Sequence, residues 1–381
     1  MSSIAMVIIA LTLGIKPATA TFYGLAQSGM GDPCVDAMPT VLIISPNGEY
    51  VLVIWNVGTA RIWNIQSGAV LDNFQDSEKA SMWSAAFSPD SKSVALGTSD
   101  GAMVLRDVST GAMMQTFTHD IDDANPGLIA VVGINFSPDG KSLLTSDTYG
   151  GRLWDVRTGK QIFAFPSHDR EANDSEETVS FSPNGQYVLV DGHPTLWNAQ
   201  TGEKIHAFDN YENARFSPDG QYILTLQSAN GIALWDAHTY QQIHTFDGYF
   251  GKFSPNGRYL YVYTDQAPPS LWDLQTMTKL TTFVDSNDDI SAFFPDSEHI
   301  LVDVTTGYTS QVDTYIVWDI KKGIILRTIN ISDFATTPLA ITDDGSVLLT
   351  GSTEKQIRSW DLATGKEILN YCQVQSPKPT A

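Results

Sequence analysis

The chain has 381 residues, of which 42% are hydrophobic and 17% are charged, a composition that can supply a large core and shows no sign of disorder. Lys and Arg number 22 against 43 Asp and Glu, for a formal charge of −21. This excess of acid argues against a nucleic-acid backbone or an anionic membrane surface as the main partner, because both attract clustered cations. The two cysteines cannot build a zinc cluster or a disulfide-rich scaffold.

The N-terminal segment has the features of a secretory signal. Residues 4–15 form an uncharged apolar run, shorter than the roughly 20 residues that a membrane-spanning helix needs. Ala18–Ala20 (Ala-Thr-Ala) is a small-x-small site of the kind that signal peptidase cuts. We therefore expect residues 1–20 to be a signal peptide, Thr21 to be the mature start, and the protein to be secreted or periplasmic. The alternative is an uncleaved anchor or a buried first strand, since no basic residue precedes the apolar run. Without a signal the protein would be cytoplasmic.

A tetrapeptide of the type Ser-Pro-Asp/Asn-Gly recurs along the rest of the chain. Pro followed by Asp-Gly or Asn-Gly is turn chemistry, so each copy predicts a turn between two strands. Six copies are close to this pattern and two are more divergent. They begin at Ser45, Ser88, Ser137, Ser182, Ser217, Ser254, Phe294 and Thr342.

A second pattern, Trp-Asp or Trp-Asn, follows these turns and usually precedes Thr-Gly or Ser-Gly. Arg106 takes the place of the Trp in one copy, where Thr110-Gly111 keeps the same offset. Successive copies are 37 to 48 residues apart, which indicates eight repeats of one supersecondary unit. The tryptophans are Trp63, Trp154, Trp197, Trp235, Trp272, Trp318 and Trp360.

Each repeat contains four strand-like segments. Alternating apolar residues and β-branched or aromatic content favour strands, and no segment after residue 20 has a convincing helical period. In the fifth repeat the expected strands are 213–216, 222–226, 232–235 and 242–246.

The co-registered turns and Trp-Asp pairs resemble the WD-repeat family of β-propellers. The resemblance covers about residues 37–372 and implies an all-β fold of eight four-stranded blades, or seven blades plus an extra sheet. It also implies that the repeated tryptophans are structural, each wedged between neighbouring sheets with its indole N–H on a partner. Residues 21–36 are expected to be a lead-in and residues 373–381 a flexible tail. The Gly-His pair that precedes the family's blades is missing here, so its His–Asp–Trp brace is expected to be incomplete in most blades.

Enzymatic readings of the sequence are weaker. Residues 97–101 match the G-x-S-x-G nucleophile elbow, but that motif needs a strand-to-helix turn and here lies between two expected strands. Asp-x-x-Thr-Gly-Lys strings such as 361–366 resemble the docking motifs of eight-bladed quinoprotein dehydrogenases, without the Trp that follows the Gly there. Residues 254–262 resemble lactonase-type propeller repeats. A quinoprotein or lactonase enzyme is therefore the alternative to a non-catalytic protein.

The segments between repeats are strongly acidic. They hold 17 acidic residues against two bases, Lys79 and Arg170. In the family these inter-blade loops share one face. We therefore expect this face to bind a protein or peptide, and a cationic one because the face is acidic. The alternative is a solvated acidic rim that aids solubility. No cofactor is expected; Ca²⁺ is the one metal that these oxygen ligands suit, although no EF-hand spacing is present. The residues expected to form the binding face are Asp120, Asp122, Asp123, Asp169, Glu171, Asp174, Glu176, Glu177, Asp285, Asp288 and Asp289. The other acidic residues of the inter-blade segments are Asp76, Glu78, Asp209, Glu212, Asp247 and Asp333.

The two cysteines lie at the two ends of the repeat array. Cys34 lies just before the first strand of the first repeat, and Cys372 is expected to end the last strand of the eighth. If the ring closes, both come to the one junction that has no covalent link, and an oxidising compartment would allow them to pair. We therefore expect a Cys34–Cys372 disulfide in a monomeric, exported interaction protein that binds no nucleic acid and no membrane once the signal is removed. The alternatives are two unrelated thiols and an intracellular scaffold.

Overall fold

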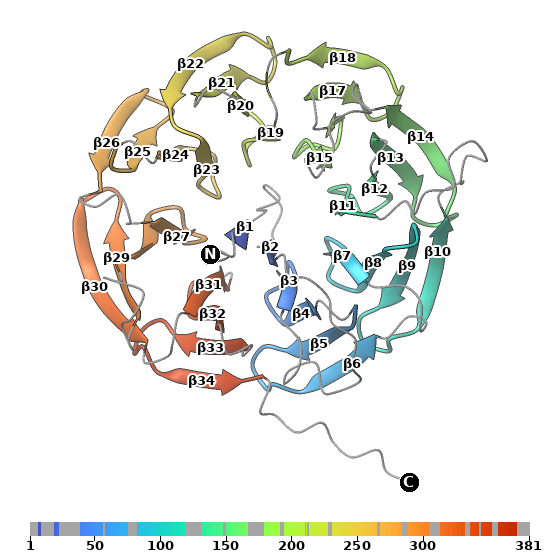
Figure 1. The fold of residues 1–381 in the computed structure, drawn as a ribbon, viewed down its shortest axis with the longest axis horizontal. Helices are drawn as coiled ribbons and strands as arrows, with labels where there is room; N and C mark the ends of the chain where they lie inside the picture. Colours follow the sequence, from blue (N-terminus) through green and yellow to red (C-terminus); the bar gives the residue numbers. More distant parts are fainter. Residues whose placement is uncertain are drawn as a thin grey trace, which may run out of the picture.

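Antiparallel β-sheets follow one another around a central axis in the computed structural model, which forms a closed ring (Figure 1). Each sheet is one blade, with its first strand innermost and its fourth on the outer rim. The structure describes residues 7–8, 19–22, 39–55, 58–74, 82–118, 131–147, 150–166, 179–190, 194–209, 211, 213–227, 231–264, 267–283, 289–304, 313–331, 336–342, 344–352 and 357–371.

The ring contains eight blades, and each is built from one contiguous stretch of chain, so no strand is exchanged between blades. This confirms the eight-bladed expectation over the arrangement with seven blades and an extra sheet. The first four blades consist of β3 (Pro39–Ile44), β4 (Tyr50–Trp55), β5 (Ala60–Asn64) and β6 (Val70–Phe74); β7 (Met82–Phe87), β8 (Ser93–Thr98), β9 (Ala102–Asp107) and β10 (Met113–Thr118); β11 (Gly133–Phe136), β12 (Ser142–Asp147), β13 (Gly150–Asp155) and β14 (Gln161–Pro166); and β15 (Val179–Phe181), β16 (Tyr187–Val190), β17 (Thr195–Asn198) and β18 (Lys204–Ala207).

The second half of the ring repeats this plan, and the strands of the fifth blade agree with the predicted ones to within one residue at each end. The last four blades consist of β19 (Asn213–Phe216), β20 (Tyr222–Gln227), β21 (Gly231–Asp236) and β22 (Gln242–Asp247); β23 (Phe250–Phe253), β24 (Tyr259–Tyr263), β25 (Ser270–Asp273) and β26 (Thr278–Thr282); β27 (Asp289–Phe293), β28 (His299–Asp303), β29 (Asp313–Asp319) and β30 (Ile324–Ile331); and β31 (Thr336–Ile341), β32 (Val347–Ser352), β33 (Ile357–Asp361) and β34 (Glu367–Asn370).

Two short strands extend the first blade toward the centre of the ring (Figure 1). β1 (Val7–Ile8) pairs with β2 (Thr19–Phe22), and β2 pairs with β3 so that Ala20 lies opposite Leu42. The expected signal-peptidase site after Ala20 therefore falls within β2. Removal of residues 1–20 stays a prediction, and it would take away β1 and half of β2.

The turn tetrapeptide forms a closed network of hydrogen bonds between the first and second strands of a blade. In the third blade the Ser137 hydroxyl donates to Asp139 Oδ1 over 2.7 Å and accepts from the Ser142 N–H over 2.9 Å. Gly140 has a φ of 69°, a left-handed conformation that glycine adopts without strain, and donates its N–H to the Ser137 carbonyl. The repeated Ser, Asp or Asn, and Gly are thus the residues that this turn requires.

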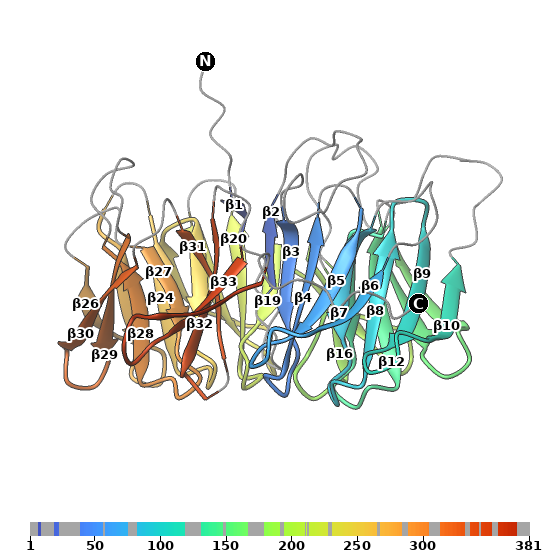
Figure 2. The ribbon, with the colours of Figure 1, turned by 90° about the horizontal axis from the view of Figure 1, so that it is seen from below.

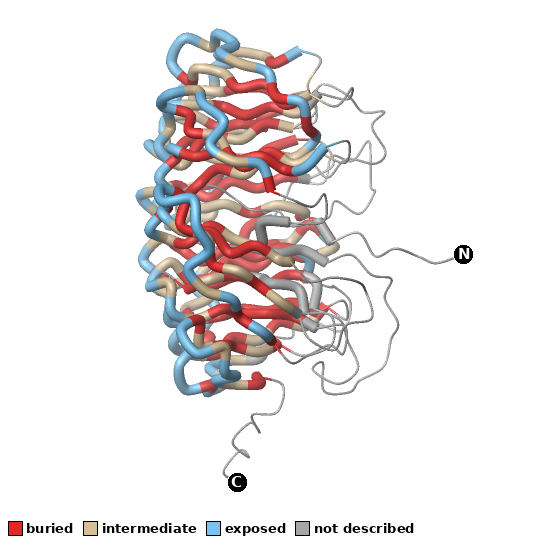
Figure 3. Tube along the Cα trace, turned by 90° about the vertical axis from the view of Figure 1, so that its left-hand side faces the viewer, coloured by how far each residue is buried: buried red, intermediate tan, exposed pale blue. Residues whose placement is uncertain are grey.

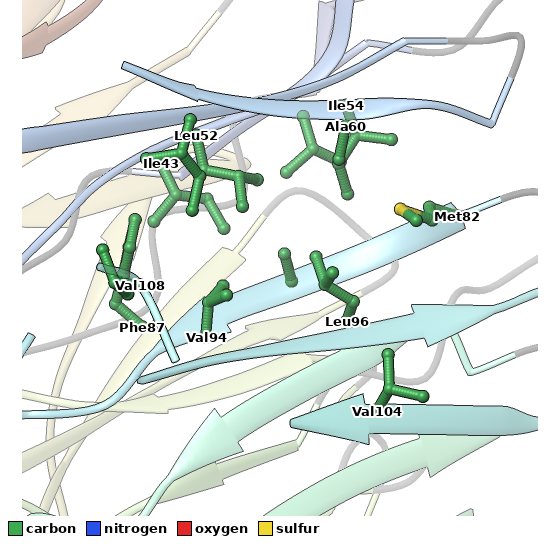
Figure 4. Packing of buried hydrophobic residues seen from close by; sticks show 13 residues of the cluster. Ile43, Leu52, Ile54, Ala60, Met82, Phe87, Val94, Leu96, Val104 and Val108 are labelled. Atoms are coloured by element: carbon green, nitrogen blue, oxygen red, sulfur yellow. The ribbon is translucent and has the colours of Figure 1, made fainter. Parts of the chain in front are cut away.

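The hydrophobic core lies between blades, where each sheet packs its face against the next. Figure 4 shows the boundary between the first two blades, where Leu52 and Ile54 of β4 face Val94 and Leu96 of β8. All four side chains are completely buried. Such layers of buried residues recur through the whole disc, with exposed residues on the outer strands and on one face (Figure 3).

The repeated tryptophans lie between blades, as the sequence predicts. A Phe at the end of one blade's fourth strand packs against the Trp of the next blade, as in Phe117–Trp154, where the ring centroids are 6.0 Å apart, and Phe246–Trp272, where they are 5.0 Å apart. The same contact joins the blades at Phe165–Trp197, Phe208–Trp235 and Phe283–Trp318.

The expectation that every indole N–H finds a partner is wrong. Trp154, Trp235 and Trp360 each donate to a Thr hydroxyl on the second strand of their own blade. This Thr comes two residues after the residue that pairs with the Trp across the two strands. Trp272 donates to Ser270. In the part of the chain that the structure describes, the buried N–H groups of Trp63 and Trp197 have no hydrogen-bond partner. The reason is that Val53 and Val190 occupy the position of that Thr in their blades.

The ring closes between the eighth and first blades through the same aromatic contact. Tyr371, just after β34, lies 5.9 Å from Trp63 between ring centroids and donates its hydroxyl to the Ile65 carbonyl over 2.9 Å. Burial raises the pKa of Tyr371 to about 12, so the hydroxyl stays protonated. Cys34 and Cys372 lie outside the described residues, and their disulfide stays a prediction.

Candidate functional site

The two faces of the disc carry different kinds of connection. The turns between first and second strands and between third and fourth strands lie on one face, here called the turn face, at the bottom of Figure 2. The strand ends that border the inter-blade segments point to the opposite face, here called the loop face. Of the acidic residues predicted there, Asp209 and Asp247 are described and exposed. Outside the described residues lie Asp76, Glu78, Asp120, Asp122, Asp123, Asp169, Glu171, Asp174, Glu176, Glu177, Glu212, Asp285, Asp288 and Asp333, and of Asp289 only the backbone is described.

The Asp or Asn of each Trp-Asp pair caps a turn on the turn face. Asp155 Oδ1 accepts hydrogen bonds of 2.7 Å from both the backbone N–H and the hydroxyl of Thr158. These bonds hold the pKa of Asp155 below its ordinary value, and Asn64 accepts the same kind of bonds from Ser67. The repeated carboxylates therefore stabilise the turns of the fold.

The G-x-S-x-G match is also structural. Residues 97–101 join β8 to β9 by a tight turn between strands, as predicted, and not by the strand-to-helix elbow that a nucleophile requires. Thr98 closes this turn by donating to Asp100 Oδ1 over 2.6 Å. A side chain at Gly97 would lie 2.5 Å from Ser84 Oγ and 2.9 Å from Val131, so this glycine is needed for close packing.

A cavity of about 300 Å³ opens on the turn face between the seventh and eighth blades. Phe294, Val317 and Leu326 form its apolar lining. Asp296 and Asp344 bring carboxylates to it, and it is also lined by Pro295, His299, Arg327 and Gly345.

His299 links two carboxylates beside this cavity. Its Nδ1 lies 2.6 Å from Asp296 Oδ2, and its Nε2 lies 3.9 Å from Asp319 Oδ2. Burial acts to raise the pKa of Asp296, but hydrogen bonds from His299 and from the Glu298 backbone outweigh it and keep the pKa low. The sequence did not lead us to expect this cavity. The residue that could have indicated it is Phe294, which replaces the Ser of the turn tetrapeptide and brings an aromatic ring to the cavity.

A second cavity of about 240 Å³ lies on the turn face between the fourth and fifth blades. Tyr187, Phe216 and Tyr240 line it together with polar side chains such as Gln186. Tyr240 has a φ of 57° at a turn position where most other blades have Gly, and it stacks on His206 at 5.3 Å. Burial lowers the pKa of His206, so at neutral pH its ring is an uncharged partner for the stack.

Neither cavity is built as a metal centre. Among the residues that the structure describes, no group of three or more His, Cys, Asp or Glu side chains is placed to hold a metal ion. Within the same residues, no helix is long and apolar enough to span a membrane.

Searches for related sequences support the assignment of the repeats. No family model matches the chain. Pre-mRNA-processing factor 19 homolog 2 of Arabidopsis thaliana is 30% identical over 148 residues, which cover 39% of this chain and 26% of that protein. The guanine nucleotide-binding protein subunit beta of Oryza sativa subsp. japonica is 26% identical over 182 residues, 45% of each chain. The match thus spans less than half of these relatives' length, and both relatives are WD-repeat proteins.

Solved structures share the fold. The C-terminal WD40 domain of Sif2 superposes with a TM-score of 0.62 at 13% identity, covering 83% of this chain and 94% of that one. The computationally designed protein Ika8 gives a TM-score of 0.64 at 18% identity, covering 86% and 96%. The chain is an eight-bladed β-propeller, and its resemblance to WD-repeat propellers is confirmed.

Proposed function

We propose that this protein is a non-catalytic interaction platform that binds a cationic protein or peptide on its loop face. The observation that carries the proposal is the distribution of charge. The inter-blade segments hold 17 acids and two bases, although the chain contains 22 Lys and Arg. Many of those cations belong to the turn face, among them Lys92, Lys141, Arg258, Lys321 and Lys322.

The cations of the turn face are largely balanced by neighbouring carboxylates. Lys141 lies 3.3 Å from Asp139, Arg258 lies 2.7 Å from Asp273, and Lys322 lies 2.8 Å from Asp319. Two bases cannot balance the acids of the inter-blade segments in this way. A surface with one sign of charge attracts an oppositely charged partner from a distance and accelerates association.

The relatives support a binding role of this kind. WD-repeat propellers serve as protein-interaction scaffolds, and one relative is by its name a subunit of a guanine nucleotide-binding protein. The rigid ring gives such a surface a fixed scaffold, because the buried layers between blades hold the strand ends that carry the loops.

The test is neutralisation of one loop. Conversion of the five acids of segment 167–178 to amides should reduce capture of partners and flatten its salt dependence, chiefly through a slower association rate. The matched control converts Asp107, Asp155 and Asp361 of the turn face to Asn, which keeps their turn hydrogen bonds. Equal capture and equal salt sensitivity of the loop variant and the control would contradict the proposal.

Export and a Cys34–Cys372 disulfide belong to the same proposal. The apolar run and the Ala18–Ala20 site support export. The position of Tyr371 at the junction of the eighth and first blades supports the disulfide, because Cys372 is the next residue. Intact-mass measurement of the protein from its host tests both, since cleavage removes residues 1–20 and a disulfide lowers the mass by two hydrogens. Retention of those residues, or free thiols in the native protein, would refute the respective part.

A further inference from the structure

The cavity between the fourth and fifth blades lies where the repeat changes at two positions. The first is Ala237, in the turn between β21 and β22. Its N–H bonds to the Gln221 carbonyl, and the equivalent residue of every blade makes the same bond. The fourth blade also has an alanine, Ala199. The other six blades have a larger aliphatic side chain, namely Ile65, Val108, Val156, Leu274, Ile320 and Leu362. Ala237 therefore leaves space that a larger side chain occupies in most blades.

The second position is Tyr240, in the same turn. Its φ of 57° is left-handed. Six blades have glycine here, which adopts this conformation without strain, and the sixth blade has Met277. A bulky side chain in this conformation costs stability, and such strained residues gather at binding and catalytic sites. The Tyr240 ring stacks on His206 at an interplanar angle of 16° and also lines the cavity.

The next junction shows the arrangement that a larger residue produces. Between the fifth and sixth blades, Leu274 packs in the core beside Tyr222, whose hydroxyl lies 3.5 Å from the Leu274 carbonyl oxygen. At the cavity, Tyr187 takes the place of Tyr222 and interacts with Tyr240 instead. Burial and this contact raise the pKa of Tyr240, so its hydroxyl stays protonated at neutral pH. Two tyrosine side chains thus border the space that Ala237 leaves.

Amide side chains from both blades complete the lining. Asn184 is held by the turn of the fourth blade, because its Oδ1 accepts the Ser182 hydroxyl over 2.7 Å and the Gln186 N–H over 3.0 Å. Gln186 and Gln221 are exposed. Within the described residues, neither Gln186 Nε2 nor the side-chain amide of Gln221 has a hydrogen-bond partner. An amide group offers both a donor and an acceptor to a ligand.

This lining selects one class of ligand. No Lys or Arg is among the described residues around the cavity, and Asp219 adds a carboxylate, which disfavours an anion. A cation would use Asp219 and the rings but would leave the amide N–H groups without an acceptor. An apolar ligand would leave the amides unpaired altogether. A sugar has hydroxyl groups that donate and accept, and C–H groups that pack on an aromatic ring, so it uses both parts of the lining.

We propose that this cavity binds a neutral pyranose, the terminal ring of a glycan. Its volume of about 240 Å³ is below the roughly 300–1,000 Å³ of pockets for drug-sized ligands, so it suits one ring. The tyrosines pack on the C–H face of the sugar, and Gln186 and Gln221 bind its hydroxyl groups from the two sides of the junction. The site is on the turn face, away from the inter-blade segments, and does not depend on the proposed function.

The first test is saturation-transfer NMR of the full chain with the methyl glycosides of glucose, galactose, mannose and N-acetylglucosamine. At least one should bind with a dissociation constant on the order of 1 mM, the range for a ligand of about a dozen heavy atoms. Saturation should be strongest on the C–H protons of one face of the ring. Failure of all four glycosides to bind, or binding of choline in their place, would overturn the proposal.

The second test places the sugar at this cavity. Ala237→Leu fills the space, Tyr240→Gly removes the ring, and Gln221→Ala removes an exposed amide. Each should weaken binding of the glycoside, the first two by about tenfold or more. The fold should be kept, because Leu and Gly already stand at these positions in other blades.

The control is Met277→Gly, the same change of turn residue one blade further on. Both glycine variants should raise the unfolding temperature, because both relieve left-handed strain, but only Tyr240→Gly should lose the sugar. This split separates a binding role of Tyr240 from a structural one. Unchanged affinity in folded Ala237→Leu, Tyr240→Gly or Gln221→Ala, or an equal loss in Met277→Gly, would overturn the proposal.

Discussion

The hydroxyl of Ser91 accepts a 3.0 Å hydrogen bond from the backbone N–H of Asn47, one blade earlier in the ring. Ser297 accepts an equivalent bond of 3.0 Å from Asn256. Both serines occupy the turn position where other blades have Gly, and their φ angles of 60° and 58° are left-handed. Where the glycine is lost, the side chain that causes the strain thus also links two neighbouring turns.

This relationship predicts an unusual order of stability at Ser91. Ser91→Ala keeps the left-handed strain and loses the hydrogen bond, so it should destabilise the protein by about 1 kcal/mol. Ser91→Gly loses the same bond but relieves strain of about 1 kcal/mol, so it should be nearly neutral. Urea unfolding midpoints of the two variants check this order, and an alanine variant as stable as the glycine variant would contradict it.

Tyr371→Phe should weaken the junction between the eighth and first blades. The variant removes a buried donor to the Ile65 carbonyl while keeping the ring contact with Trp63, which should cost about 1 to 3 kcal/mol. Hydrogen exchange should show faster opening of amides in β5 and β34 and little change in β21, on the far side of the ring (Figure 1). Uniform loss of protection around the ring would indicate that the junction is not a local unit.

Val190→Thr should stabilise the fourth blade. In blades where Thr takes this position, its hydroxyl accepts the Trp N–H, over 2.9 Å from Trp154 and 2.8 Å from Trp235. The new hydroxyl would give the buried N–H of Trp197 a partner and add about 1 kcal/mol.

The reverse change is the control for this prediction. Thr225→Val should leave the Trp235 N–H without its acceptor and cost about 1 to 3 kcal/mol. Thermal unfolding measures the stability of both variants relative to the wild type. A Val190→Thr variant less stable than the wild type would refute the explanation given for Trp197.

The turn carboxylates predict acid sensitivity. Hydrogen bonds from Ser109, Thr158 and Thr364 hold the pKa values of Asp107, Asp155 and Asp361 below their ordinary value of 3.8. A carboxyl whose pKa is lowered on folding contributes stability above its unfolded pKa and loses it as the pH falls through the folded one. The protein should therefore lose part of its stability below about pH 4.

Replacement of these three residues by Asn shows how much of the acid sensitivity comes from their carboxyl groups. Asn64 and Asn198 already accept the same turn bonds in two blades, so the triple variant should keep its unfolding temperature at neutral pH. Between about pH 7 and about pH 3 it should lose less stability than the wild type. Identical pH profiles of the two proteins would show that these carboxyls do not contribute.

The repeats predicted the fold well because turn and strand chemistry are local. Each Ser-Pro-Asp/Asn-Gly turn and each Trp-Asp turn is stabilised by residues within a few positions, as at Ser137 and Asp155, and such positions can be recognised from the sequence. The spacing indicated eight repeats, and the resemblance to WD-repeat propellers implied that each repeat is a four-stranded blade.

Contacts between strands and between blades could not be predicted in the same way. The donor on Trp197 lacks a partner because of Val190 on another strand, and only the register shows that the two positions meet. Tyr371 closes the ring through a bond to a carbonyl 306 residues away. Phe294 and Leu326 of the seventh blade share a cavity with Asp344 of the eighth only because the two blades are neighbours. The acidic loop face stays a prediction, since most of its residues lie outside the described part of the chain.

The packing of Tyr371 on Trp63 makes the final junction of the ring the same kind of contact as the junctions formed by Phe117 and Phe246. Each blade is a contiguous piece of chain, so the order in which the pieces are joined is separate from the shape that they form. A circular permutant that links residue 371 to residue 39 by a short connector, and opens the chain between two other blades, should fold to the same disc. The position of the chain ends can thus move from one blade junction to another without dividing a sheet.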